Sequence, residues 1–359
     1  KLRMSLSDSK PHALVYDQDL SLGGGTAYVS SIIAAALSTK FQVTLCGPQA
    51  PAISVLEERC SIDLPGVNVK SCASEDRGFV SQARSSDLFS VTHATWIPPY
   101  GRRNLFYCHF PLRTRWKKIG PVTLPFTGKS FYAHQYDSLL CLSLFTREWM
   151  DRLWGVKARV AYPYVSGKIS PQEKKNVILA LGRFDPVKKL EGIVGYFRKF
   201  VNQCAGEWEL ILAGFPAVPS YVDQIRALAK DLPIRFELDV SGERKATLLG
   251  EAKILWSVRG LDDPDFPVCI EHFGIPVLEA MHASTVPVSY KIGGPSEIIS
   301  SSGEDGILVG SEDELLKESL LLASNPTRLM AMGENARKRA LYFSRDRFDR
   351  EILQASLGV

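Results

Sequence analysis

Two carboxylates in the second half of the chain have surroundings that favour ligand binding. Glu271 comes three residues before Gly274, and Glu279 follows Glu271 by eight positions. Gly274 permits a tight turn and Pro276 suits the first position of a helix, so Glu279 is expected one turn inside that helix. Both carboxylates can then accept hydrogen bonds from the hydroxyls of a ligand. A glutamate retained only to complement the helix dipole is the alternative.

The start of the same helix offers backbone donors. N–H groups at a helix N-terminus point outward and attract anions. We therefore expect a phosphate to meet this turn, at Phe273, Gly274, Ile275 and Val277.

Two cations stand at a second strand-to-helix junction. Arg183 and Lys188 follow an expected strand at Asn176–Leu181. Five residues apart on one loop, they can converge on a diphosphate, Arg as a planar fork and Lys as a point charge. Solvated loop cations are the alternative.

A run of three glycines, Gly23, Gly24 and Gly25, lies between an expected strand at His12–Tyr16 and an expected helix at Thr26–Leu37. Glycines at such a junction let backbone N–H groups approach an anion closely. A flexible turn without a ligand would explain the run as well.

Strands and helices alternate almost throughout, which is typical of parallel sheets with helices on both faces. The pattern restarts after the turn-rich stretch Pro163–Pro171, so we expect two doubly wound α/β halves. Prolines between residues 65 and 125 indicate loops in the middle of the first half. In open sheets, ligands bind beyond the carboxyl ends of the strands, and a two-domain version places its site in the cleft.

The composition excludes several classes of protein. The 359 residues are 45% hydrophobic and 23% charged, which excludes disorder and coiled coil and suggests two domains. No apolar stretch reaches the roughly 20 residues of a membrane span. Seven scattered cysteines without metal-ligand spacing indicate reduced thiols in a cytosol. The N-terminus lacks the apolar stretch of a signal peptide, but it does not begin with Met, so an upstream extension stays open.

These motifs, with Gly293–Ile298 after a further strand, resemble those of the retaining glycosyltransferases of family 4, also called glycosyl transferases group 1. The resemblance implies the GT-B fold: two Rossmann-like doubly wound domains that face a central cleft. We expect an acceptor-binding domain at 1–168, a nucleotide-sugar-binding domain at 169–342, and a helix at 343–359 that crosses back to the first domain. In the first half the resemblance rests on the triple glycine and on the stretches Cys108–Pro111, Ser143–Thr146 and Tyr162–Pro163.

The resemblance also implies roles for single residues. Arg183 and Lys188 would neutralise the diphosphate of a nucleotide-sugar, Glu271 would contact the sugar, and Glu279 would hold the ribose. The triple glycine would close over the phosphate. His109 is similar to a histidine that faces the sugar in relatives, although a histidine satisfied within a loop is the alternative.

Two positions depart from the family pattern. Lys189 stands where a glycine is usual, and Ala283-Ser284-Thr285 replaces a common Ala-Gly-Thr. Neither departure removes an expected ligand.

No metal or other cofactor is expected. Asp17-Gln-Asp19 and Asp263-Pro-Asp265 both spell D-x-D, but two carboxylates are too few to argue for a metal site. Arg183 and Lys188 can stabilise the departing charge without a metal.

The expected activity is transfer of a sugar, with retention, from a nucleoside diphosphate sugar to an acceptor hydroxyl. GDP-mannose and UDP-sugars are the candidate donors, and a glycan or a lipid-linked sugar is the candidate acceptor. The alternatives are a nucleotide-sugar epimerase or hydrolase of this fold, and a non-catalytic partner subunit.

An acid-free stretch, Leu88 to Tyr136, carries seven cations interleaved with aromatic residues. Such a pattern suits an anionic membrane surface, which favours a cytoplasmic protein that binds the membrane peripherally. Ordinary solvated cations over a core of aromatic rings, or a soluble polyanionic acceptor, would explain it too. No nucleic-acid recognition motif accompanies the stretch. The expected membrane or acceptor patch consists of Arg102, Arg103, Arg113, Arg115, Lys117 and Lys118.

Overall fold

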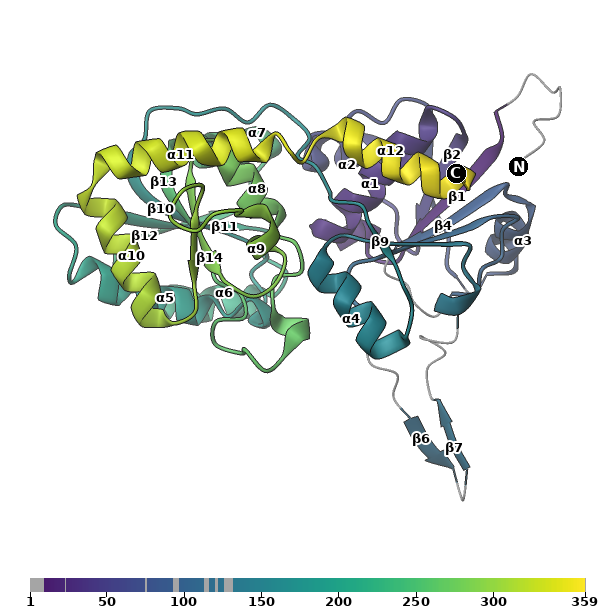
Figure 1. Cartoon of the computed structure of the whole chain (residues 1–359), viewed down its shortest axis with the longest axis horizontal. Helices are drawn as coiled ribbons and strands as arrows, with labels where there is room; N and C mark the ends of the chain where they lie inside the picture. The colour runs from purple at the N-terminus through teal and green to yellow at the C-terminus, as the bar shows by residue number, and fades with distance from the viewer. Residues whose placement is uncertain are drawn as a thin grey trace. The chain divides into compact units, whose positions relative to one another are not determined.

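The computed structural model describes residues 10–22, 24–74, 76–92, 97–112, 116–119, 122–125 and 132–358. The chain divides into two compact units (Figure 1). Unit 1 comprises residues 1–167 together with 343–359, and unit 2 comprises residues 168–342. Gly23, Arg113 and Arg115 from the expected site and patch lie outside the described residues.

Unit 1 is built on a seven-stranded parallel sheet in the order β3-β2-β1-β4-β5-β8-β9. Its strands are β1 (His12–Asp17), β2 (Gln42–Gly47), β3 (Val67–Ser71), β4 (Leu88–Thr92), β5 (Asn104–Cys108), β8 (Ser138–Cys141) and β9 (Arg159–Val160). Its helices are α1 (Gly25–Ser38), α2 (Ile53–Cys60), α3 (Arg77–Ser85), α4 (Leu144–Trp154) and α12 (Arg345–Leu357). Strands β6 (Trp116–Ile119) and β7 (Val122–Pro125) form a separate antiparallel pair.

Strands β4 and β5 differ from the loops that the prolines indicated. All five residues of each strand are buried. Both strands lie inside the parallel sheet with neighbours on both edges, and since their successive side chains are all buried, neither face of these strands is exposed to solvent. Short, fully buried strands lack the alternation that marks a strand in a sequence, which is why the prolines alone indicate loops here.

The last helix returns to unit 1, as the resemblance predicted. Phe348 in α12 is fully buried, and its ring packs against those of Tyr107 and Tyr164. Near the end of the helix, the carbonyl of Ala355 accepts hydrogen bonds from Ser138 Oγ (2.9 Å) and Arg103 Nε (3.3 Å). These contacts fix α12 to the β5–β8 part of the sheet.

Unit 2 is built on a six-stranded parallel sheet in the order β12-β11-β10-β13-β14-β15. Its strands are β10 (Lys175–Leu181), β11 (Glu209–Gly214), β12 (Ile234–Leu238), β13 (Ala252–Ser257), β14 (Val286–Tyr290) and β15 (Ile307–Val309). Its helices are α5 (Leu190–Val201), α6 (Pro219–Leu228), α7 (Gly242–Glu251), α8 (Ile275–His282), α9 (Pro295–Ile298), α10 (Glu312–Ser324) and α11 (Pro326–Ala340).

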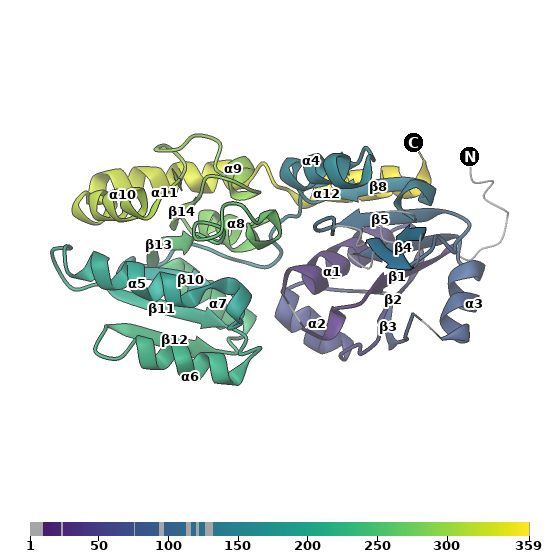
Figure 2. The same cartoon turned by 90° about the horizontal axis from the view of Figure 1, so that it is seen from below.

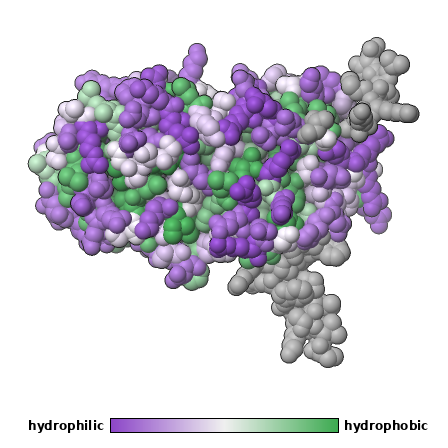
Figure 3. All heavy atoms as spheres, in the orientation of Figure 1, coloured by the Kyte–Doolittle hydropathy of each residue, from purple (hydrophilic) through white to green (hydrophobic). Residues whose placement is uncertain are grey.

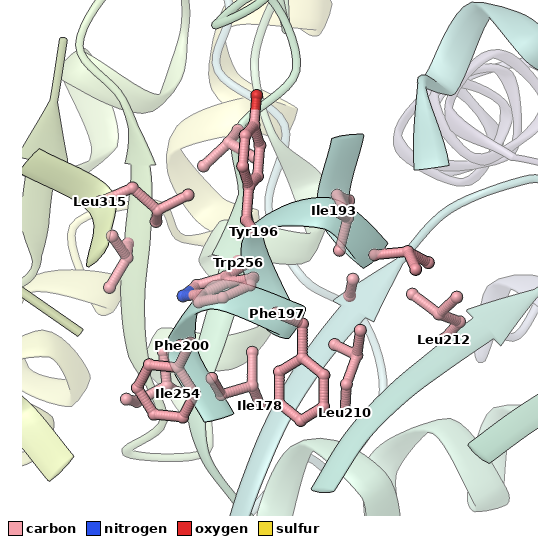
Figure 4. Close-up of a cluster of buried hydrophobic side chains, with 14 of the residues drawn as sticks. Ile178, Ile193, Tyr196, Phe197, Phe200, Leu210, Leu212, Ile254, Trp256 and Leu315 are labelled. Carbon is pink, nitrogen blue, oxygen red and sulfur yellow. The ribbon is translucent and has the colours of Figure 1, made fainter. Parts of the chain in front are cut away.

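Helices cover both faces of this sheet. Figure 1 shows α5 and α6 below it and α7, α8 and α11 above it, and Figure 2 gives the view from below. One core cluster packs α5 and α10 against β10, β11 and β13, and Figure 4 shows its aromatic centre at Phe197, Phe200 and Trp256. Each of these three side chains is at most 1% exposed.

Caps fix where the last helices begin. Ser311 Oγ accepts from the N–H of Glu314 at the start of α10, and Asn325 Oδ1 accepts from that of Arg328 at the start of α11. Ser344 accepts in the same way from Arg347 before α12. Such caps satisfy backbone donors that lack partners within a helix.

Within the described residues, no helix combines the length and the apolar character that a membrane span requires. In the described part of the chain, no disulfide joins any of the seven cysteines. On the face drawn in Figure 3, apolar and hydrophilic side chains are interspersed.

Both departures from the family pattern fall at left-handed backbone positions. Lys189 has a φ of 51° and Ser284 a φ of 53°. Glycine adopts this conformation without strain, which explains why it is usual at both places. Lys189 gains an ion pair with Asp263 at 3.0 Å, whereas the hydroxyl of Ser284 makes a longer contact with Glu334, at 3.5 Å.

We predict that Ser284→Gly stabilises the protein. The left-handed conformation costs other residues about 1–2 kcal/mol, and part of that gain is lost to the greater freedom of glycine in the unfolded chain. The free energy of unfolding, measured in urea, should rise by about 0.5–1 kcal/mol. Ser220→Gly, at an exposed position of helix α6, is the control and should lower the free energy of unfolding by about 0.5 kcal/mol. Destabilisation by both substitutions would contradict the prediction.

Candidate functional site

The two expected cations share the loop that follows β10. Gly214, at the end of β11, has a φ of 154°, and a Cβ there would lie 1.8 Å from the carbonyl oxygen of Gly182. Only glycine therefore lets the two strand ends approach. At Gly182, by contrast, a Cβ would make only ordinary contact with Cδ and Cε of Lys188, at 3.8 Å, so this contact does not require glycine.

A short 3-10 turn, η3 (Pro186–Lys188), ends this loop. Asp185 caps the turn by accepting a hydrogen bond from the N–H of Val187 at 2.8 Å, and its other oxygen lies 3.3 Å from Arg183 Nη2. One carboxylate thus shapes the turn and holds Arg183 beside it.

Lys188 faces Glu271, and the two side chains form an ion pair with Nζ 3.6 Å from Oε2. Burial lowers the pKa of Lys188, and the attraction of Glu271 offsets this only in part. Burial by itself would raise the pKa of Glu271. The positive charges of Lys188 and Arg259 outweigh this effect, so the pKa of the carboxyl group is lowered. The neighbouring cations thus keep Glu271 ionised although it is withdrawn from water.

The glycines at 293 and 294 hold the backbone of Glu271. The N–H of Gly294 donates to the carbonyl of Glu271 at 2.9 Å. A Cβ at Gly294 would lie 2.1 Å from the Cα of Phe273, and one at Gly293 would lie 2.4 Å from the Glu271 carbonyl oxygen. This glycine pair is the physical reason why the carboxylate of Glu271 sits where Lys188 can reach it.

Helix α8 begins one residue before the position that the sequence indicated. Gly274 is its N-cap with a φ of 103°, Ile275 is the first helical residue, and the preceding Phe273 is buried. The N–H of Val277 donates to the Gly274 carbonyl at 2.9 Å, so it closes the turn and is not available for a phosphate in this conformation. The N–H groups of Gly274 and Ile275 lie at the positions where a helix start leaves donors outside its own ladder.

Glu279 lies inside α8 and is 4% exposed. Its Oε1 accepts a hydrogen bond from Lys245 Nζ at 2.6 Å. The charge of this buried carboxylate is thereby neutralised by a lysine of α7, 34 residues away in the sequence. The bond from Lys245 uses one carboxylate oxygen of Glu279. The expected contact with a ribose hydroxyl would use the other oxygen.

Lys245 and Arg259 were not expected from the sequence. Both lie in segments without a recognisable motif, and only the fold brings them beside Glu279, Lys188 and Glu271. A signal existed for Arg259, because it directly follows the strand that the largely apolar run Lys253–Val258 predicts, and ligands bind beyond the carboxyl ends of such strands.

One carboxylate of each D-x-D motif forms hydrogen bonds or an ion pair with other residues of the protein. Asp17 is buried and accepts hydrogen bonds from Ser30 Oγ at 2.6 Å and the N–H of Asp19 at 2.9 Å, and burial raises its pKa to about 6. Asp263 pairs with Lys189. Among the described residues, no group of three or more His, Cys, Asp or Glu side chains could hold a metal ion.

The candidates of unit 1 lie at the carboxyl ends of its strands. His109 directly follows β5, is 8% exposed, and packs edge-on against the ring of Tyr107. Gly24 is the N-cap of α1 with a φ of 84°. Both Gly24 and Gly25 are exposed, and a Cβ added at either position would meet no other atom within 4 Å. The backbone at the start of α1 is therefore open to an approaching ligand.

Two arginines of the basic patch interact with other groups of the protein. Arg102 pairs with Asp87 at 3.0 Å, although its side chain stays 73% exposed, and Arg103 binds the Ala355 carbonyl. Phe106 and Tyr107, two of the interleaved aromatic residues, are buried in the core. For Lys117 and Lys118 only the backbone is described, as part of β6.

Comparison with known proteins identifies the second unit. Residues 165–339 match the sequence model of the family described as glycosyl transferases group 1. Unit 2 belongs to this family. The resemblance seen in the motifs is confirmed, and the group 1 match covers the ends of β10 and β13, α8 and the glycine pair.

Curated proteins similar to this chain include mannosyltransferases. The chain is 26% identical over 229 residues to a Dictyostelium discoideum GDP-Man:Man(3)GlcNAc(2)-PP-Dol alpha-1,2-mannosyltransferase, over 58% of this chain and 44% of the relative. It is 26% identical over 263 residues to the Neurospora crassa alpha-1,3/1,6-mannosyltransferase alg-2, over 58% of this chain and 53% of the relative. The chain thus spans about half the length of these relatives.

Solved structures confirm the GT-B fold. Anabaena HepE, crystallised with UDP and glucose, superposes with a TM-score of 0.75 at 15% identity, over 97% of this chain and 100% of that one. The sucrose-phosphate synthase of Thermosynechococcus elongatus superposes with a TM-score of 0.71 at 15% identity, over 96% and 98%. At this identity the likeness establishes the fold alone.

We predict that Arg183→Ala and Lys188→Ala each weaken the binding of a nucleoside diphosphate and lower turnover by about 100-fold, the effect of losing one fixed charge-stabilising donor. Calorimetry and a donor-consumption assay measure the two effects. Lys230→Ala, an exposed lysine of the same unit, is the matched control and should behave as wild type. Wild-type binding in both folded variants would remove these residues from the site.

Proposed function

We propose that the protein is a glycosyltransferase that moves a sugar from a nucleoside diphosphate sugar to an acceptor hydroxyl with retention at the anomeric carbon. The observation that carries the proposal is the Lys188–Glu271 pair at the ends of β10 and the β13–α8 loop, with Arg183 and Glu279 on the adjoining segments. A cation suited to phosphate and a carboxylate suited to hydroxyls meet at the strand ends, where open α/β sheets bind ligands.

The chain's own residues then divide the work. Arg183 and Lys188 contact the diphosphate, Glu271 accepts from the hydroxyls of the transferred sugar, and Glu279 accepts from the ribose. Fixed cations stabilise the charge that develops on the departing diphosphate, so positioning and electrostatics suffice and no covalent intermediate is needed. Because these cations are in place, we propose that transfer needs no divalent metal.

GDP-mannose is the donor that we propose first. The relatives whose names specify a donor are GDP-Man enzymes, and the Glu-His-Phe-Gly form at 271–274 resembles some mannosyltransferases. UDP-sugars are the alternative class, because the structural neighbour HepE was crystallised with UDP-glucose.

Transfer from purified donors tests this function. Thermal shift with GDP, UDP, GDP-mannose and UDP-glucose selects the nucleotide, because a ligand that binds the folded state raises the unfolding temperature. Incubation with the selected donor and candidate acceptors should then give a product with the anomeric configuration of the donor, as NMR coupling constants show, and activity should survive EDTA. An inverted product would refute retention, and loss of activity restored by Mg²⁺ or Mn²⁺ would refute the metal-free proposal. Absence of both binding and transfer would refute the function.

We further propose a lipid-linked acceptor. The support is the lipid-linked substrate named for the relatives and the acid-free basic stretch of unit 1. The protein should sediment with anionic vesicles at low salt and be released as salt screens the charges. Neutralising Lys117 and Lys118 together should weaken sedimentation, whereas neutralising Arg102, which already pairs with Asp87, should change it less. Wild-type protein that stays in the supernatant would favour a soluble acceptor.

A further inference from the structure

The loop between β13 and α8 brings a third cation to the candidate site. β13 ends at Ser257, and it is the parallel neighbour of β10, with Leu179 paired to Leu255. The segments that leave these two strands therefore emerge side by side at one edge of the sheet. Arg259 is the second residue after the end of β13. Its side chain lines the same small cavity as Lys188 and Lys189.

Acidic residues of this loop tie it to the β10 side of the unit. Asp263 pairs with Lys189 at 3.0 Å, and Asp262 accepts a hydrogen bond from the hydroxyl of Tyr196. Tyr196 belongs to the core cluster, and Figure 4 shows its hydroxyl pointing out of that cluster. A Cβ at Gly192 would lie 2.7 Å from Asp262 Oδ2, so the glycine makes room for this contact. The loop is thus anchored to Lys189 and to α5, directly after Lys188 in the sequence.

The start of the loop also has a fixed conformation. Gly260 has a φ of 101°, and a Cβ there would lie 2.9 Å from Ile270 Cγ1 and 3.1 Å from Tyr290 Cδ1. Arg259 Nη2 donates to the carbonyl of Val268 at 3.2 Å, across the loop. Arg259 thus leaves β13 in a set direction and is not a freely solvated side chain.

Arg259 keeps an unused donor at the site. Its Nε lies buried and, within the described part of the chain, has no hydrogen-bond partner. Burial of an unpaired donor costs about 1–3 kcal/mol, so its persistence calls for an explanation in a ligand or another partner. Besides burial, the charges that act on the pKa of Lys188 are one carboxylate, Glu271, and two cations, Arg259 and Arg183. An anion would relieve this excess of positive charge.

We propose that Arg259 contacts the diphosphate of the bound nucleotide-sugar, as a third cation beside Arg183 and Lys188. This inference rests on the proposed function. A planar guanidinium can present its Nε–H and an Nη–H together to two phosphate oxygens, which a lysine cannot do. Arg259 therefore fits an oxyanion better than a single hydroxyl.

The proposed role is strongest during transfer. The bond between the anomeric carbon and the diphosphate oxygen breaks, and its electron pair stays on that oxygen. The acceptor oxygen forms the new bond to the anomeric carbon, and its proton passes to the departing diphosphate. Before this proton arrives, the diphosphate carries one more negative charge than in the donor, which a fixed Arg259 stabilises.

Calorimetry with GDP and GMP tests the contact, or with UDP and UMP if thermal shift selects uridine nucleotides. Arg259→Ala should weaken diphosphate binding about tenfold or more, with a much smaller effect on the monophosphate, and should lower turnover by about 100-fold. Arg259→Lys keeps the charge but loses the fork, so it should restore binding only in part. The control is Arg226→Ala, an arginine of α6 that pairs with Asp223 and should leave binding and turnover unchanged.

The outcomes separate this inference from the proposed function. Wild-type protein that neither binds nucleoside diphosphates nor transfers sugar would overturn the function. Wild-type protein that does both, together with an Arg259→Ala variant that matches Arg226→Ala, would overturn only the role of Arg259. Equal losses for GDP and GMP would also overturn it, because they would indicate a general disturbance of the unit. If Arg259→Ala does not fold, the same comparison is made with Arg259→Lys, where wild-type affinity for GDP overturns the contact.

Discussion

The contact between Lys188 and Glu271 is the interaction that links the fold of unit 2 to its proposed chemistry. Two opposite charges are held 3.6 Å apart, partly withdrawn from water, at the end of a parallel sheet. A surface ion pair of this length would contribute little to stability. Its position suggests a use in binding instead, because each partner has the chemistry of a different part of a nucleotide-sugar. In this structure the two groups form an ion pair, so a diphosphate that binds as we propose would compete with Glu271 for Lys188.

Glycines fix the backbone on both sides of this pair. Gly214 lets the end of β11 meet the Lys188 loop, and Gly293 and Gly294 press the next loop against the segment that carries Glu271. A side chain at any of these positions would collide with backbone atoms, so the site depends on residues that themselves carry no functional group. A different constraint acts at Lys189 and Ser284, where the backbone keeps the left-handed conformation that favours glycine although the glycine is absent.

Much of unit 2 could be predicted because its strands are short apolar runs separated by clear helical patterns. The strand predicted at Asn176–Leu181 is found as β10, and Gly274 precedes a helix, α8, as predicted. Strands β4 and β5 could not be predicted in this way, since full burial removes the alternation and prolines flank them. Lys245 and Arg259 reach the site only through tertiary contacts, which no local pattern encodes. The roles of His109 and of the basic patch stay predictions.

We infer that Glu271 competes for Lys188 and contacts the sugar, whereas Glu279 serves the nucleoside. Calorimetric titration of the bare nucleoside diphosphate into Glu271→Gln and Glu279→Gln distinguishes the two roles, with sugar transfer assayed alongside. The two substitutions should affect nucleotide binding differently. Glu271→Gln removes the negative charge that pairs with Lys188, so nucleotide binding should stay equal or become tighter, while sugar transfer should fall. Glu279→Gln should weaken nucleotide binding by about 1–3 kcal/mol, the cost of leaving buried polar groups unpaired. Weaker nucleotide binding in Glu271→Gln, with wild-type binding in Glu279→Gln, would contradict both assignments.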